Sequence, residues 1–193
     1  SYHHTHARLA VHALRQGAVA VVEKPLATSV GQLDDLLTAL DVTKGRFFAG
    51  FHKRYAPFNA FARRDLGTRL GDPVHYHAIV FEEPLPARHW YRWPNSCSRI
   101  VSNGCHWLDH FLFLNDWSDP VGVEVSRGPS ESEMANVSVR LANGAVFSLV
   151  LTDIVAGRIH AYCPAAPSLP MFAGKVRQLG VTYQKPTPLA PGV

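Results

Sequence analysis

Hydrophobic and polar positions in the first part of the chain follow a regular order of helical and extended patterns. Apolar residues recur at helical spacing over residues 5–16 and again over residues 30–40. Two short apolar runs follow these stretches: residues 18–22 predict a buried strand, and residues 47–51 predict a second strand. The resulting order of helix, strand, helix and strand is typical of parallel βαβ units. We therefore expect an α/β arrangement in this part of the chain.

Both predicted helices have recognisable boundaries. Thr5 stands where it can cap the first helix, and Gly17 stands at a position that ends one. Ser29 and Gln32 have the spacing of a capping box at the start of the second helix. The apolar stripes expected to face the core are Leu9, Ala10, Ala13 and Leu14 in the first helix and Leu33, Leu36, Leu37 and Leu40 in the second.

After residue 57 the pattern changes to strands with fewer helices. Helices are predicted over residues 57–66 and 105–114, separated by an alternating strand over residues 74–81 and a loop over residues 82–99. A further strand is predicted over residues 121–125. A hairpin follows, with strands over 134–142 and 145–152 and a turn at Asn143-Gly144. The proline-rich tail after about residue 157 is expected to be irregular. This part therefore predicts an α+β domain, with the boundary near residues 55–57.

Lys24 is the first candidate for chemistry. It follows the apolar run at the carboxyl end of a predicted strand, and ligands of open α/β sheets bind at that edge. A surface lysine that merely ends a core strand fits the position equally well.

The predicted helix around His106 is the second candidate. Ser102, His106, Asp109 and His110 share roughly one helical face. Imidazole is the usual general base near neutral pH because its ordinary pKa lies near 6.5. From the pattern alone, histidines satisfied within an amphipathic helix remain the simpler interpretation.

Composition narrows the class of protein. The chain has 193 residues, 47% hydrophobic and 18% charged, which is typical of a globular protein. It contains no apolar run long enough for a membrane span and no recognisable secretory leader. The net charge of +4 comes from scattered basic residues, which gives no indication of nucleic-acid binding. Cys97, Cys105 and Cys163 form no C-x-x-C pair, so we expect free thiols and a cytoplasmic location.

Three segments together resemble the Gfo/Idh/MocA family of oxidoreductases, named after glucose–fructose oxidoreductase and inositol dehydrogenase. They are residues 3–27, residues 47–57 and residues 102–114. The resemblance implies an α/β plus α+β fold. Residues 1–56 would be the C-terminal part of a Rossmann domain, without its glycine-rich half. Residues 57–193 would form an α+β domain for substrate binding and oligomerisation, with a large open, mainly antiparallel sheet.

The resemblance also implies an activity and a set of site residues. The activity is hydride transfer between NAD or NADP and a sugar, cyclitol or related polyol, with no metal ion. The catalytic residues would be Lys24 and His106. The cofactor would lie beside His6, Glu23, Lys24, Pro25 and Arg54, and the substrate beside Trp90, Tyr91, Arg92, Ser102 and His106. Arg88 and Arg92 in the loop over residues 82–99 would also suit an anionic substrate.

The chain departs from the family pattern in two ways. Ser102 stands where many members carry an aspartate, which puts an aspartate-assisted mechanism in doubt. No G-x-G-x-x-G segment is present, so we expect the chain alone to bind dinucleotides weakly and to be inactive. Because the implied sheet is open on one face, we also expect the full-length protein to form homo-oligomers. Two alternatives remain open at this point. One is a non-catalytic remnant of such an enzyme, and the other is a metal-dependent hydrolase that uses some of the 11 histidines.

Overall fold

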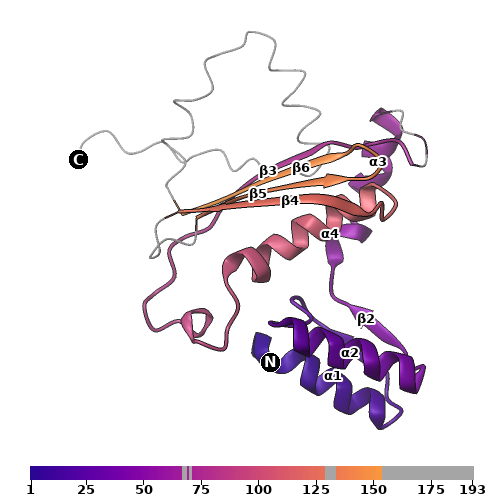
Figure 1. Ribbon diagram of the computed structural model, residues 1–193, viewed down its shortest axis with the longest axis vertical. Coiled ribbons are helices and arrows are strands. Elements are labelled where there is room, and N and C mark those ends of the chain that lie inside the picture. The colour runs from indigo at the N-terminus through magenta and orange to yellow at the C-terminus, as the bar shows by residue number, and fades with distance from the viewer. Residues whose placement is uncertain (67–68, 70, 129–133, 154–193) are drawn as a thin grey trace.

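Two parallel strands and two helices form the N-terminal part of the structure (Figure 1). The computed structural model describes residues 1–66, 69, 71–128 and 134–153. A short turn of 3-10 helix, η1 (His3–Thr5), leads into α1 (His6–Arg15). The elements that follow are β1 (Ala20–Val22), α2 (Val30–Thr43) and β2 (Phe47–Ala49). Strands β1 and β2 pair in parallel, with Ala20 opposite Phe47, so the predicted βαβ unit is confirmed.

The helix boundaries follow most of the sequence signals. Thr5 is an exception, because its hydroxyl makes no capping bond to α1 and donates instead to the Tyr2 carbonyl at 2.7 Å. Gly17, just beyond α1, has a φ of +74°, a conformation that glycine adopts without strain. The Ser29 hydroxyl accepts a hydrogen bond from the Gln32 amide at 3.3 Å, as a capping box requires. The Gln32 side chain accepts its return bond from the Thr28 amide at 2.9 Å, one residue earlier than in the standard box.

Only one face of the β1–β2 pair is covered within the described residues. Ala20 and Val22 are buried against α1 and α2, whereas Val21 is 77% exposed. Successive side chains of a strand point to opposite faces, so the helices cover alternate positions. The prediction of a fully buried run at residues 18–22 is therefore wrong in this structure. The predicted apolar stripes of the two helices are wrong in part, because Leu9, Leu33 and Leu37 are exposed.

Among the described residues, the second sheet has four strands in the order β3-β6-β5-β4. They are β3 (Tyr76–Phe81), β4 (Pro120–Arg127), β5 (Ala135–Leu141) and β6 (Val146–Thr152). Strand β3 runs parallel to β6, and the other two pairs are antiparallel. The hairpin turns at Asn143-Gly144, where Gly144 has a φ of +89°. The described part of the sheet is thus mainly antiparallel, as expected.

Helix α4 (Cys105–Leu114) packs against this sheet (Figure 1). Phe111 and Phe147, both fully buried, stack with ring centroids 5.1 Å apart at the centre of the core. A π-helical segment, η4 (Ile100–Gly104), precedes α4 without a break. The bounds of α4 match those expected from the sequence.

Two short elements, η2 (His52–Tyr55) and α3 (Phe58–Leu66), connect the two sheets. A third, η3 (Trp90–Arg92), lies between β3 and η4. Segment η2 contacts α4, so residues 52–55 lie against the second sheet's helix although they follow β2 directly. A domain boundary at residues 56–57 stays a prediction. The predicted irregular tail lies outside the described residues. No helix in the described part is long and apolar enough to cross a lipid bilayer.

Candidate functional site

Lys24 joins the end of β1 to the start of the α4 region. Its Nζ donates a hydrogen bond of 2.7 Å to the backbone carbonyl of Ser102. Ser102 lies in η4, where its side chain is 1% exposed. Two site residues predicted from the sequence therefore meet in the fold, although 78 positions separate them.

His106 lies in the first turn of α4, close to the lysine. The residue is 7% exposed, and its buried Nδ1 has no hydrogen-bond partner in the part of the chain that the structure describes. Burial, followed by the positive charges of Lys24, His52 and Lys53, lowers the pKa of His106 to about 4. The imidazole is consequently neutral near pH 7, which is the form that accepts a proton.

Lys53 lies beside the candidate site, and the sequence reasoning did not predict this. Its Nζ lies over the ring of Trp107, 3.9 Å from the ring centroid. Burial, followed by the charge of Lys24, lowers the pKa of Lys53 below its ordinary value. Lys53 belongs to the segment 47–57 that carries the family resemblance. Its sequence pattern does not show that it reaches α4, because that contact depends on the path of the chain after β2.

Arg54 and Asp109 form an ion pair between η2 and α4. The Arg54 Nε donates to Asp109 Oδ2 at 2.8 Å, and Nη2 donates to Oδ1. The hydrogen bonds with Asp109 raise the pKa of Arg54 above its ordinary value, although burial opposes the shift. The contacts of Arg54 thus hold η2 against α4, and its predicted role beside a cofactor stays a prediction.

His110 is held in a network that fixes its tautomer. Asn59 uses its amide nitrogen to donate to the carbonyls of Lys53 and Arg54, at 2.9 and 2.8 Å. Its Oδ1 therefore accepts from His110 Nε2 at 2.9 Å, so His110 Nδ1 accepts from the Tyr76 hydroxyl at 3.3 Å. Burial, and then the charge of Lys53, lowers the pKa of His110 to about 4. Asn59, which the sequence reasoning missed, links His110 to the backbone of Lys53 and Arg54.

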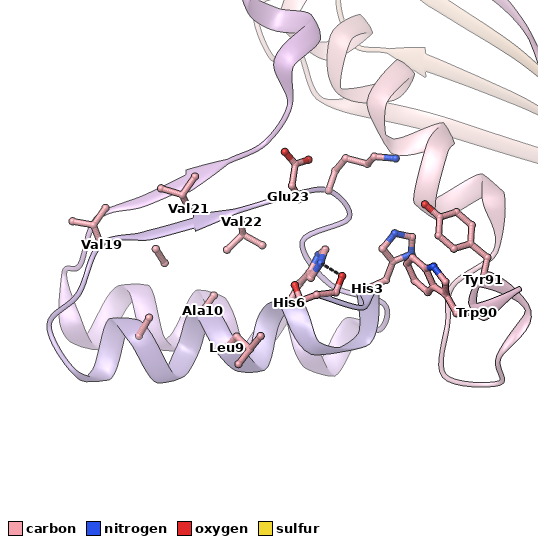
Figure 2. Close-up of a pocket in the computed structure, with 14 residues that line it drawn as sticks. His3, His6, Leu9, Ala10, Val19, Val21, Val22, Glu23, Trp90 and Tyr91 are labelled. Carbon is pink, nitrogen blue, oxygen red and sulfur yellow. Dashed lines mark hydrogen bonds between the residues drawn. The ribbon is translucent and has the colours of Figure 1, made fainter.

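A cavity of about 600 Å³ opens beside β1 (Figure 2). Its lining includes five residues that the sequence analysis assigned to the cofactor or the substrate: His6, Glu23, Lys24, Trp90 and Tyr91. Lys24 therefore contributes both to this cavity and to the contact with Ser102. The cavity and the His106 region meet at this lysine.

His6 positions the turn after β1. Its Nδ1 lies 2.8 Å from the carbonyl of Pro25, so Nδ1 carries the proton and donates it. The Lys24–Pro25 peptide bond is cis. His6 and Pro25, both expected beside the cofactor, are thus in direct contact.

The aromatic wall of the cavity comes from two distant segments. The ring of His3 lies 4.6 Å from that of Trp90 and 4.7 Å from that of Tyr91, measured between centroids. His3 Nδ1 also lies 3.6 Å from Cys97 Sγ. Burial lowers the pKa of His3 to about 4, so it packs as a neutral ring.

The two arginines expected to face the substrate lie elsewhere. Arg92 is exposed, and its Nε donates to the Leu85 carbonyl at 3.2 Å. Arg88 is exposed as well, and the cavity lining contains neither. A role of Arg92 in substrate binding stays a prediction, without support from these contacts. Within the part of the chain that the structure describes, no three histidine, cysteine or acidic side chains gather as metal ligands would.

Comparisons with known proteins give no match to a family model or to a curated protein. Solved structures do match. An NAD-binding protein from Listeria innocua superposes with a TM-score of 0.65 at 20% identity, over 78% of this chain and 46% of that one. UDP-N-acetylglucosamine 3-dehydrogenase GnnA from Acidithiobacillus ferrooxidans gives 0.61 at 24% identity, over 78% and 48%. The WlbA dehydrogenase from Bordetella pertussis, in complex with NADH and UDP-GlcNAcA, gives 0.65 at 17% identity, over 80% and 47%.

These likenesses establish the fold. The chain shares with these three structures a fold in which a parallel βαβ unit is followed by helices and a mixed sheet. Two of these three structures are named dehydrogenases, and the third is named an NAD-binding protein. The chain spans about half the length of the solved structures that it matches.

Proposed function

We propose that the chain belongs to the Gfo/Idh/MocA family and that the full-length protein is an NAD- or NADP-dependent oxidoreductase acting on a sugar, cyclitol or related polyol. The observation that carries the proposal is the contact of Lys24 with the Ser102 carbonyl, beside the buried His106. This contact places the end of β1, at the edge where ligands of α/β sheets bind, next to a neutral imidazole.

The residues around the cavity suit a nicotinamide cofactor. His6, Glu23 and Lys24 lie along the cavity at the end of β1, and Pro25 lies next to them. The fully buried Ser102 Oγ has no partner among the described residues, so a hydroxyl-rich ligand would complete its hydrogen bonding. These residues would hold the nicotinamide end of the cofactor, with Arg54 nearby on η2. When bound, the cofactor supplies hydride transfer at its nicotinamide ring.

The protein side chains would handle the proton and the charge. Nδ1 of His106 is enclosed, so Nε2 is the ring atom that accepts the proton of the reacting hydroxyl, a contribution of about 10²–10⁴-fold. The Lys24 ammonium, held by the Ser102 carbonyl, stabilises the negative charge that develops on that oxygen. Trp90 and Tyr91 offer ring faces on which a sugar-like substrate would stack, and Ser102 replaces the usual aspartate with a neutral hydroxyl.

The proposal extends to the setting of the protein. Ile79 is 57% exposed and Phe81 36% exposed on the sheet face opposite α4, an apolar surface suited to the homo-oligomer expected of the full-length protein. Cys97 and Cys105 form no disulfide among the described residues, which is consistent with the expected cytoplasmic location.

Turnover with an isotopically labelled substrate tests the proposal. The full-length protein is incubated with NAD⁺ or NADP⁺ and a panel of sugars and cyclitols, and formation of the reduced cofactor is followed by absorbance. We expect a substrate deuterated at the carbinol carbon to transfer its deuterium to the nicotinamide ring. Tight cofactor binding without turnover of any panel member would favour the non-catalytic alternative. Turnover without deuterium transfer would contradict the hydride mechanism.

A further inference from the structure

Two imidazoles from different elements are in contact at the start of α4. His52, the first residue of η2, places its ring 4.7 Å from the ring of His106, between centroids, with the two planes inclined by 69°. The two residues differ in their access to water, because His106 is 7% exposed whereas His52 lies exposed on the surface. The hydride mechanism uses His106 and leaves His52 without a role.

The other side chains that reach His106 from β1 and η2 are cationic or apolar. Lys24, at the end of β1, and Lys53, on η2, both act on this ring with their positive charge. The ring of Phe51, just before η2, lies 6.0 Å from it, between centroids. An ammonium group has no electron pair for a proton, and neither has a phenyl ring, so none of these three side chains can take a proton from His106.

The titratable groups of α4 around His106 are not proton acceptors near pH 7 either. Burial raises the pKa of the Cys105 thiol to about 11, so this thiol already carries its proton. Arg54 engages both carboxylate oxygens of Asp109. One turn further along, both ring nitrogens of His110 are hydrogen-bonded. His52 therefore offers the proton acceptor that these groups do not.

A proton that His106 has accepted is unstable in these surroundings. Burial, followed by the neighbouring positive charges, lowers the pKa of His106 to about 4, so the imidazolium form is strongly disfavoured at pH 7. Alcohol oxidation releases one proton in each turnover, and this proton must leave the buried ring before the next turnover begins. An exposed imidazole in contact with the buried one offers the proton a more favourable position and a path to water.

We propose that His52 relays the proton between His106 and solvent. In alcohol oxidation, Nε2 of His106 takes the proton of the reacting hydroxyl, and the carbinol hydrogen leaves with its electron pair as the hydride. The His106 imidazolium then gives the proton to a ring nitrogen of His52, directly or through one water molecule, and His52 releases it to solvent. Both imidazoles are then neutral again, and carbonyl reduction follows the same path in reverse. This inference rests on the proposed function, because it extends the path of the same proton.

Turnover of the full-length protein at low buffer concentration tests the relay. The substitution His52→Phe keeps a ring against His106 but removes both nitrogens. With a sugar or cyclitol of the panel that the protein oxidises, we expect His52→Phe to lower kcat at pH 7 by about 10- to 100-fold, up to the low end of the range for a proton-transfer group. The KM for the alcohol should stay within about twofold of wild type. Added imidazole should restore kcat of His52→Phe in a saturable manner and should leave wild type unchanged.

A histidine outside the site provides the matched control. His77 lies exposed on β3, so His77→Phe should keep the kcat of wild type without imidazole. An unchanged kcat in His52→Phe, or a fall in kcat that imidazole does not restore, would overturn the relay. A higher KM with an unchanged kcat would also overturn it, because His52 would then only hold the substrate.

The titration of His106 tests the contact between the two rings without a substrate. It is followed by nuclear magnetic resonance of the histidine ring nitrogens in the full-length protein. The substitution His52→Phe should raise the pKa of His106, because the charge of His52 lowers this pKa in wild type. An unchanged titration would overturn the relay, since the two rings would then not interact. Absence of turnover with every panel member would refute the proposed function and the relay with it, whereas turnover with an intact kcat in His52→Phe would refute the relay alone.

Discussion

Replacement of His110 by glutamine should reduce the loss of stability that the protein undergoes in acid. His110 is 2% exposed, and both of its ring nitrogens are hydrogen-bonded, so the folded state holds it neutral. Its pKa is about 4 in the folded protein and ordinarily 6.5. As the pH falls below about 6.5, the unfolded state binds a proton first, which lowers the stability of the folded state until the folded pKa is reached. Between about pH 7 and about pH 5 this histidine accounts for a loss of about 2 kcal/mol.

The prediction is measured by urea unfolding followed by circular dichroism at several pH values. The free energy of unfolding of wild type should fall by about 2 kcal/mol more than that of His110→Gln over this pH interval. His12 lies exposed on α1, so His12→Gln should show the wild-type dependence. Identical pH dependence of His110→Gln and wild type would refute the reasoning, because it would mean that the folded state does not exclude the proton from this ring.

Three further substitutions test other parts of the structure. His106→Asn should lower the rate of alcohol oxidation by about 10²–10⁴-fold near neutral pH, since it removes the proton acceptor, and a larger effect of His110→Gln would move that role to His110. Asp109→Asn should lower the free energy of unfolding by at most about 3 kcal/mol, because the half-buried Arg54 loses its carboxylate partner, and an unchanged midpoint in urea would contradict the ion pair. Leu36→Ala should lower the free energy of unfolding by about 2–5 kcal/mol, because Leu36 is 1% exposed. Leu37 is 55% exposed, so Leu37→Ala should lower it by less than about 1 kcal/mol, and equal losses would contradict the packing of α2.

The sequence was informative wherever local chemistry determines the backbone. The Asn143-Gly144 dipeptide indicated the hairpin because its turn requires a positive φ, which Gly144 has. Serine and glutamine at positions 29 and 32 located the start of α2 to the residue. The periodic burial of Tyr76 and Ala78 on β3 followed from the alternation of a strand. These features depend on neighbours a few positions apart, so they can be recognised without knowledge of the fold.

The parts that were missed depend on contacts between distant segments. Lys53 lies beside the candidate site because η2 lies against α4 and brings its ammonium over Trp107. Asn59 matters because it links His110 to the carbonyls of residues 53 and 54. The exposure of Val21 depends on which face of β1 the helices cover, which an apolar run cannot indicate. The candidate site was therefore located at Lys24 and His106, but the second lysine beside it was not.

The central claim is that Lys24 stabilises charge on the reacting oxygen of the substrate. The most direct measurement is kcat/KM for cofactor reduction by the full-length protein, compared among wild type, Lys24→Met and the control Lys44→Met. We expect Lys24→Met to lower kcat/KM by at least about 10²-fold, mainly through kcat, while the fold and the control variant remain unaffected. Wild-type turnover by a folded Lys24→Met protein would contradict the claim, because the ammonium at the end of β1 would then have no part in the chemistry.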